Sequence, residues 1–402
     1  MLNFYKRHVE EVLLPFWSRA LDHRNGGVFT CFNNAGDRLI STDKYTWSQG
    51  RFLWLWSRLA RMTAECKLSG EPEPYHEHLH KTALFLDEHV FLDNGNCAFL
   101  LTENGDKKES IPGQGFDTSF YADCFVAIGM GEYAGLMQDR GRLDKALAVY
   151  KRIRDRLDRG DIRSEPYPVP DGYRAQSVPM IMLNVSQGLA EVAETLDHPE
   201  SGRLLDHSIA YMRDIMDNFC LDDHHLVEML PEDSSETGTL LYRHLNPGHA
   251  IECMWFVMHT ARRTGYTGYL EKAAMVMERA ARLGWDPVHG GLLRFADCEG
   301  GEPKGERGGS AYEKLITGSW DLKLWWPHSE ALYASLLAGN TPLHERFRDY
   351  TFSVFPNPDK TVGEWIQIRD RQGKPVEKVA ALPVKDPFHI LRNMLLIIDH
   401  LS

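Results

Sequence analysis

The sequence predicts an all-α protein in which about twelve helices close into an (α/α)6 barrel. Segments with helical apolar periodicity fill most of the chain, and short glycine-rich hairpins separate them. The hairpins recur roughly every 65–70 residues, as expected for an internal structural repeat. One hairpin with two helices cannot bury its own apolar surface, whereas six such units can close a ring. We therefore expect residues 1–402 to form a single domain with the hairpins at its mouth.

The predicted helices are the segments whose apolar residues follow the helical period. The second and eighth are apolar on more than one face, which is typical of helices packed on several sides, and the ninth has a charged face typical of an outer helix. In order, the helices cover residues 2–22, 44–67, 73–91, 117–137, 142–158, 177–196, 199–218, 247–265, 267–284, 324–339, 343–354 and 386–401.

Glycine turns next to apolar residues predict the hairpins. They lie at residues 25–37, 94–106, 222–228, 289–295 and 363–373, and the Pro/Gly-rich segment 159–173 fills the gap in the series. A further segment, 299–316, contains five glycines. We interpret it as a mobile loop or lid beside the centre of the ring.

Polar side chains recur near the starts of the even-numbered predicted helices. In an alternating ring these helices run in the same direction, so their first turns should meet in one mouth. The residues are Arg51 and Asp123 on the second and fourth helices, His249 and Glu252 on the eighth, His328 and Glu330 on the tenth, and His389 with Arg392 on the twelfth. We expect Asp123 to be structural and the histidines to form a proton-transfer site.

The residue types indicate sugar chemistry. Histidine has a pKa near neutrality, so two imidazoles on opposite faces of a substrate could remove and return a proton next to a carbonyl group. Arg51 could stabilise the negative charge that develops. Indole rings stack on sugar faces, and the candidates are Trp47, Trp325, Trp326 and Trp365. Glycoside hydrolysis is a distant alternative because it usually needs two carboxylates flanking the bond.

Composition excludes several other classes. The net charge of −12 and the lack of a basic block argue against nucleic-acid binding. Residues 1–20 predict an amphipathic helix rather than a signal peptide, and no apolar run reaches membrane-spanning length. The seven cysteines have no CxxC pair, which favours reduced thiols and a cytoplasmic location. We interpret His76-Glu77-His78-Leu79-His80 as a solvated face, and no cluster requires a metal ion.

Eight strings of the sequence resemble the N-acylglucosamine 2-epimerase family, in one order along nearly the whole chain. They are Gly26 to Phe29, Asp43 to Arg51, Tyr121 to Phe125, Asn246 to Glu252, Gly284 to Gly291, Leu324 to Ala331, Gly363 to Trp365, and Phe388-His389. Several motifs of this length in a shared order argue against chance similarity.

The resemblance implies an (α/α)6 barrel that epimerises N-acylated hexosamines reversibly at C2 through an enediolate-type anion. It assigns the two essential histidines to His249 and His389, the essential arginine to Arg51 and the essential glutamate to Glu330. Glu252, one turn after His249, is where a residue would orient that imidazole. We expect the substrate to contact Trp47, Asn184, Glu252, Trp325, Trp326, His328 and Trp365. The family also suggests a homodimer.

The sequence departs from relatives in three places. Residues 179–184 lack the third histidine that sugar isomerases and cellobiose epimerases carry, which favours the acylglucosamine branch. Residues 382–388 differ from the Gly-Gly-Pro-Phe-Lys-Gly-Cys string of better-known acylglucosamine enzymes. Between Asp155 and Arg174 we find no match to the glycine- and lysine-containing loop through which ATP activates some members. The sequence thus predicts no required cofactor and gives no support for ATP as an activator.

The leading hypothesis is interconversion of N-acetylglucosamine and N-acetylmannosamine. The second hypothesis keeps the chemistry but changes the substrate to mannose or another unsubstituted sugar, handled by an epimerase or an aldose–ketose isomerase. The third is a non-catalytic protein-binding role, and the presence of Arg51, His249, Glu330 and His389 argues against it.

Overall fold

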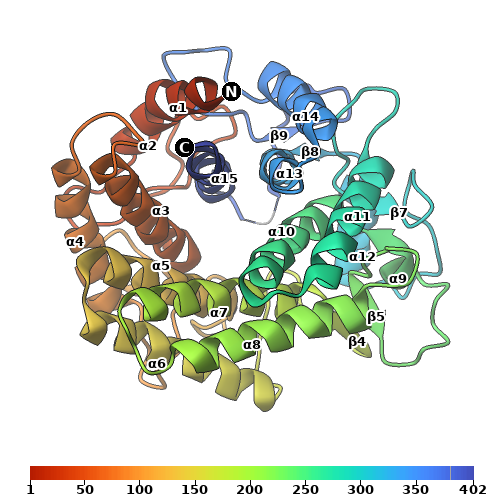
Figure 1. Cartoon of the computed structure of the whole chain (residues 1–402), viewed down its shortest axis with the longest axis horizontal. Coiled ribbons are helices and arrows are strands. Elements are labelled where there is room, and N and C mark those ends of the chain that lie inside the picture. Colours follow the sequence, from red (N-terminus) through yellow and green to blue (C-terminus); the bar gives the residue numbers. More distant parts are fainter. Residues whose placement is uncertain (381) are drawn as a thin grey trace.

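A computed structural model describes residues 1–380 and 382–402 and confirms the (α/α)6 barrel. Six inner helices form the central ring, and each packs against the next until the last returns to the first (Figure 1). They are α3 (Thr46–Ala64), α5 (Tyr121–Met137), α7 (Ser177–Thr195), α10 (Pro247–Thr264), α13 (Trp325–Leu337) and α15 (Phe388–Leu401). These are the even-numbered helices of the sequence analysis.

The outer ring wraps the inner one, with one outer helix or helical run packed on each inner helix. Two of the outer runs pass through a π-helical turn, namely η1 in the first and η2 in the fourth. The outer elements are α1 (Leu2–His8), η1 (Val9–Leu13) and α2 (Leu14–Arg19), then α4 (Glu73–His89), α6 (Arg140–Asp158), α8 (Ser201–Asp214) with η2 (Ile215–Phe219), α11 (Thr267–Gly284) and α14 (Thr341–Val354).

Two short helices lie outside the twelve predicted ones, α9 (Leu240–Arg243) and α12 (Ala311–Ser319). The expectation of a loop over 299–316 is therefore wrong from Ala311 onward. The Ser310 side chain accepts from the backbone N–H of Glu313, and the Glu313 carboxylate accepts from the N–H of Ser310. This capping box starts α12, and its Ser-x-x-Glu signature is visible in the sequence.

Short antiparallel strands fix where the inner helices start. A strand directly before four of these helices pairs with a strand of the following repeat, so neighbouring helix starts are tied together at one end of the ring. The pairs are β1 (Lys44–Tyr45) with β2 (Leu100–Leu101), β4 (Tyr173–Ala175) with β5 (Met229–Pro231), β6 (His244–Leu245) with β7 (Ala296–Asp297), and β8 (Lys323–Leu324) with β9 (Ile368–Arg369).

The predicted glycine hairpins are confirmed in reduced form. The hairpin around Gly105 pairs β2 with β3 (Lys107–Lys108), and the other turns close on isolated bridges. These bridges join Leu21 to Val28, Phe32 to Leu39, Phe91 to Cys97, Cys220 to Leu226, Trp285 to Leu292, Pro356 to Trp365, and Arg369 to Pro375.

Close packing of the inner ring requires glycine at two facing positions. A Cβ atom on Gly129 of α5 would lie 2.2 Å from the Gly50 carbonyl oxygen, and one on Gly50 would lie 2.4 Å from the Phe125 carbonyl oxygen. The backbones of α3 and α5 therefore approach each other more closely than residues with side chains allow. Among the described residues, no helix has both the length and the apolar character needed to cross a membrane.

Buried lysine–aspartate pairs brace the mouth in two repeats. Lys44 donates to Asp22 at 2.7 Å, and Lys323 lies 3.5 Å from Asp286, which also pairs with Arg371 at 3.0 Å. Each aspartate precedes a Gly-Gly turn, and each lysine lies two residues before an inner helix. Although burial alone would raise it, Arg371 and Lys323 hold the pKa of Asp286 at about 2.

We predict that Asp286→Asn lowers the free energy of unfolding by about 3–5 kcal/mol at pH 7, because it leaves the Lys323 charge buried without a partner. Since the folded pKa lies below the unfolded value of about 3.9, the stabilisation is complete above that value and declines as the pH falls toward about 2. Urea unfolding measures the change. Asp349→Asn is the matched control, because that carboxylate is 71% exposed and should change stability little. Equal effects of the two substitutions would contradict the bracing role.

Candidate active site

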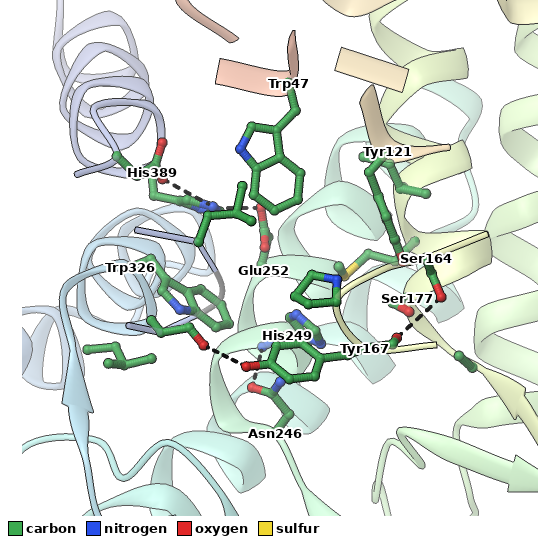
Figure 2. A pocket seen from close by; sticks show the side chains of 18 of the residues that line it. Trp47, Tyr121, Ser164, Tyr167, Ser177, Asn246, His249, Glu252, Trp326 and His389 are labelled. Carbon is green, nitrogen blue, oxygen red and sulfur yellow. Dashed lines mark hydrogen bonds and ion pairs between the residues drawn. The ribbon is translucent and has the colours of Figure 1, made fainter. Parts of the chain in front are cut away.

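A cavity of about 270 Å³ lies at the end of the ring where the inner helices start. This volume is slightly below the range of about 300–1,000 Å³ that is typical of ligand pockets, and it suits a monosaccharide. All six inner helices contribute side chains to its wall, among them Arg51, Phe125, Asn184, His249, Trp326 and His389. Figure 2 labels the last three of these residues. The expected convergence of helix starts is therefore present.

His389 lies in the first turn of α15 and is held by Glu330 of α13. The Nδ1 atom of His389 lies 2.7 Å from Glu330 Oε1. Glu330 is fully buried and also accepts hydrogen bonds from Trp255 Nε1 at 2.7 Å and Arg392 Nη2 at 2.6 Å. Burial opposes ionisation of Glu330, but Arg392 and His389 lower its pKa to about 2. An ionised carboxylate only accepts, so the hydrogen is on Nδ1 and Nε2 of neutral His389 is left as a base.

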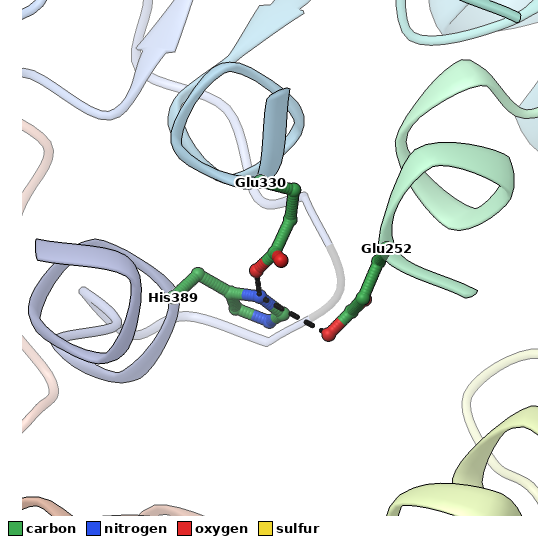
Figure 3. A group of neighbouring side chains, drawn as sticks. All are labelled: Glu252, Glu330 and His389. Atoms are coloured by element: carbon green, nitrogen blue, oxygen red, sulfur yellow. Dashed lines mark hydrogen bonds and ion pairs between the residues drawn. The ribbon is translucent and has the colours of Figure 1, made fainter. Parts of the chain in front are cut away.

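Glu252, Glu330 and His389 form a compact group in which one oxygen or nitrogen atom from each lies within 4.8 Å of the others (Figure 3). Such a set resembles metal ligands, but Arg392 donates to Oε1 of both carboxylates. The guanidinium therefore supplies the positive charge that the two carboxylates need. A metal ion would have to displace this buried cation.

His249 lies in the first turn of α10 and is held by Glu228. The Nδ1 atom lies 2.6 Å from Glu228 Oε1, and the backbone N–H is capped by Asn246. Burial favours the neutral imidazole, but the Glu228 carboxylate outweighs it and raises the pKa of His249. The expectation that Glu252 orients His249 is therefore wrong, because Glu252 pairs instead with Arg392 and lies 3.7 Å from His389 Nδ1.

Trp326 lies close to both histidines, on one side of the cavity. Its ring centroid is 5.3 Å from that of His249 and 5.5 Å from that of His389, with tilts of 41° and 43°. Both imidazoles line the same cavity, and both use Nδ1 to contact a carboxylate. Each Nε2 atom is therefore the nitrogen left for a substrate, and the two approach from different helices (Figure 2).

Arg51 of α3 lines the cavity inside an aromatic surround. Its guanidinium carbon lies 3.9 Å from the Phe125 ring centroid, 5.1 Å from that of Phe388 and 5.2 Å from that of Trp47. Asp386, in the turn before α15, lies 3.5 Å from Arg51 and 3.6 Å from His389 Nε2. Burial lowers the pKa of Arg51, and Asp386 opposes the shift. This places a cation and a hydrogen-bond acceptor beside His389.

The structure separates the predicted substrate-binding residues into two groups. Trp47, Asn184, Glu252, Trp325 and Trp326 line the cavity. Trp365 and His328 do not line it, so the expectation that they contact the substrate is wrong. Trp365 is fully buried in the wall and donates to His8 Nε2 at 2.8 Å. His328 is fully buried, contacts the Leu324 carbonyl through Nδ1, and accepts from the Leu292 N–H through Nε2. Burial lowers the pKa of His328 to about 3, so it is a neutral structural residue.

Two further residues of the sequence analysis lie away from the cavity. Asp123 accepts from the Cys97 N–H and pairs with Arg156, which confirms its structural role. His78 is buried and contacts the Gly27 carbonyl at 2.9 Å, so the predicted solvated face is wrong for this residue.

Several wall residues were not predicted to be site residues from the sequence. Glu228 and Arg294 lie close to the starts of strands β5 and β7. The hint for Glu228 in the sequence was its charge at the otherwise apolar end of the predicted hairpin 222–228. The other missed residues include Tyr121, Tyr167, Ser177, Met180, Ile181, Phe295 and Tyr312.

The sequence profile described as N-acylglucosamine 2-epimerase (GlcNAc 2-epimerase) matches residues 27–392. The chain belongs to the N-acylglucosamine 2-epimerase family. It is similar to the N-acylglucosamine 2-epimerases of Bos taurus, at 29% identity over 96% of this chain and 87% of the relative, and of Homo sapiens, at 28% identity over 97% and 88%. It is also similar to a cellobiose 2-epimerase of Dictyoglomus turgidum, at 21% identity over 98% of this chain and 97% of the relative.

Solved structures share the fold. A cellobiose 2-epimerase from Bacillus thermoamylovorans has a TM-score of 0.78 at 18% identity, with 99% of both chains covered. A D-mannose isomerase has a TM-score of 0.76 at 16% identity, covering 99% of this chain and 98% of the other. Family membership and the site together identify the chain as an isomerase that epimerises a sugar.

We predict that Glu228→Gln lowers kcat about 10- to 100-fold, because the amide no longer favours the imidazolium form or fixes the tautomer of His249. The titration of His249 should move to lower pH, since Glu228 raises its pKa. Nitrogen NMR of the histidine side chains reads the titration directly. Glu232→Gln is the matched control, because Glu232 is exposed at the end of the same strand. An unchanged titration of His249 in Glu228→Gln would contradict the positioning role.

Proposed function

We propose that the chain interconverts N-acetylglucosamine and N-acetylmannosamine by moving the proton at C2 of the open-chain sugar. The observation that carries this proposal is the pair of carboxylate-held imidazoles, His249 and His389, in the wall of one cavity beside Trp326. Epimerisation needs one group to remove a proton from one face of C2 and another to return a proton to the opposite face.

In the first step, Nε2 of one neutral histidine takes the C2 proton. The electron pair of the broken C2–H bond forms a C1–C2 double bond, and the electrons of the C1 carbonyl move to its oxygen as negative charge. Arg51 is the cation placed to stabilise this enediolate-type anion. In the second step, the other histidine, in its imidazolium form, gives its Nε2 proton to the opposite face of C2. The carbonyl forms again, and the reverse reaction exchanges the two roles.

The cavity wall supports an N-acylated substrate. Asn184 of α7 offers an amide that could form a hydrogen bond with an acylamino group. This helix lacks the third histidine that sugar isomerases and cellobiose epimerases carry. Met180 and Ile181 of the same helix supply an apolar surface suited to an acyl methyl group. The mammalian relatives carry the name of the acylglucosamine activity.

We further propose that turnover needs no bound cofactor and no ATP, because the side chains described above can carry out both proton transfers. We propose a cytoplasmic location because all seven cysteines are unpaired thiols, which are typical of proteins in a reducing compartment.

We also propose a homodimer, on the family resemblance. Light scattering coupled to gel filtration should give twice the chain mass of 46.0 kDa. A mass of one chain at micromolar concentration would refute the dimer.

The function is tested by proton NMR of N-acetylmannosamine in D2O, with and without ATP. We predict N-acetylglucosamine carrying deuterium at C2, at the same rate in both arms. A mannose arm serves as the comparison. Faster deuterium incorporation into mannose than into N-acetylmannosamine would contradict the proposed substrate and favour an unsubstituted sugar.

The two-histidine mechanism predicts a pattern in single variants. His249→Asn and His389→Asn should each lower epimerisation by at least about 100-fold. Each should still exchange the C2 proton of one epimer with solvent, and the two variants should differ in which epimer exchanges. Separate incubation of each epimer in D2O measures this. Exchange of both epimers by one variant would contradict the assignment of one histidine to each face.

A further inference from the structure

The wall of the cavity contains a patch that the proposed proton transfer does not use. We call it the Arg294 subsite, formed by Arg294, Tyr167, Phe295, Tyr312 and Leu315. Its aromatic rings lie against one another, with centroid distances of 6.4 Å from Tyr167 to Tyr312 and 6.3 Å from Phe295 to Tyr312. Phe295 and Tyr312 belong to a small apolar cluster separate from the main core.

The Arg294 side chain is buried, with 8% of the residue exposed. Among the described residues, it donates one hydrogen bond, from Nη2 to the Ala380 carbonyl oxygen at 2.9 Å. No carboxylate of the described residues lies within 4.0 Å of its guanidinium. Tyr167 donates to the same Ala380 oxygen at 3.2 Å, so this carbonyl is shared. Burial lowers the pKa of Arg294, whereas the paired Arg392 has a raised pKa.

The other ionised groups of the cavity wall are paired. Arg51 faces Asp386, Arg392 is bonded to Glu252, and Glu228 is bonded to His249. Among the described wall residues, the charged groups without an ion-pair partner are Arg294 and Glu165. Glu165 is only partly buried, and it does not lie within 4.0 Å of the Arg294 guanidinium. A buried guanidinium without an anion is costly, so such groups are usually compensated by a carboxylate or by a ligand.

We propose that Arg294 binds an anionic group of the substrate, and that the enzyme prefers an N-acylated hexosamine with a carboxylate or phosphate at C6. The planar guanidinium matches the oxygens of either group. With C1 and C2 between the two histidines and Arg51, as proposed above, the end of the substrate left to reach Arg294 is the far one. The opposite end of an open-chain hexose is C6. This inference rests on the proposed function and deepens it by naming the substrate class.

The test compares three sugars, N-acetylmannosamine, its 6-phosphate and the corresponding C6 carboxylate, N-acetylmannosaminuronate. Rates of C2 deuterium incorporation give kcat/KM for each sugar, and calorimetry gives affinity independently of turnover. The wild-type protein should prefer at least one anionic sugar over the neutral one by about 10-fold or more. The arm that shows the preference identifies the anion.

Substitutions separate anion binding from a structural role. Arg294→Gln should lower the preference for the anionic sugar by about 10- to 100-fold relative to the neutral sugar, and Arg294→Lys should retain part of it. Arg307→Gln is the matched control, because it removes an exposed arginine that does not line the cavity. It should leave the preference among the three sugars unchanged.

Equal affinity of the wild-type protein for neutral and anionic sugars would overturn the proposal, as would an Arg294→Gln variant that weakens all three equally. In that case Arg294 only ties Ala380 to the wall. Turnover of the neutral sugar without any anionic preference would leave the proposed function standing. Charge-dependent binding without deuterium incorporation into any sugar would remove the proposed function and support the anion site.

Discussion

Arg392 connects three inner helices at the point where the active site is built. Its guanidinium, on α15, is bonded to Glu252 of α10 and Glu330 of α13, and all three side chains are buried. Two carboxylates this close would repel each other and could not both stay ionised without a cation between them. The same cation lowers the pKa of Glu330, and the ionised Glu330 sets the tautomer of His389. The reactive nitrogen of His389 is thus oriented by a buried ion pair.

The two histidines reach similar geometry by different means. His389 relies on a carboxylate from a neighbouring inner helix, whereas His249 relies on Glu228, which lies just before strand β5 (Met229–Pro231). Glu330 is already compensated by Arg392, whereas no lysine or arginine of the described residues lies within 4.0 Å of Glu228. Glu228 therefore outweighs the effect of burial and raises the pKa of His249. Each imidazole is thus held through Nδ1 by a carboxylate with a different environment.

The barrel supplies this arrangement because strand pairs and buried charges fix the helix starts. The pairs β6 with β7 and β8 with β9 lie directly before α10 and α13, the helices that carry His249 and Glu330. Lys323 enters β8 with its ammonium buried against Asp286, which ties that strand to the preceding glycine turn. Small displacements of these strands would be carried into the cavity, since a helix moves as a rigid unit.

The sequence by itself determined the twelve helices, the ring and the positions of Arg51, His249, Glu330 and His389, because helical periodicity and the order of motifs are local properties of the chain. Only the tertiary structure decided which of these side chains face the cavity. Trp365 and His328 looked like site residues but are buried in the wall, where one indole and one imidazole satisfy neighbouring polar groups. Glu228 and Arg294 looked unremarkable, because strands paired between repeats bring them to the cavity from distant parts of the chain. Pairing of this kind depends on contacts across the ring, which no single segment encodes.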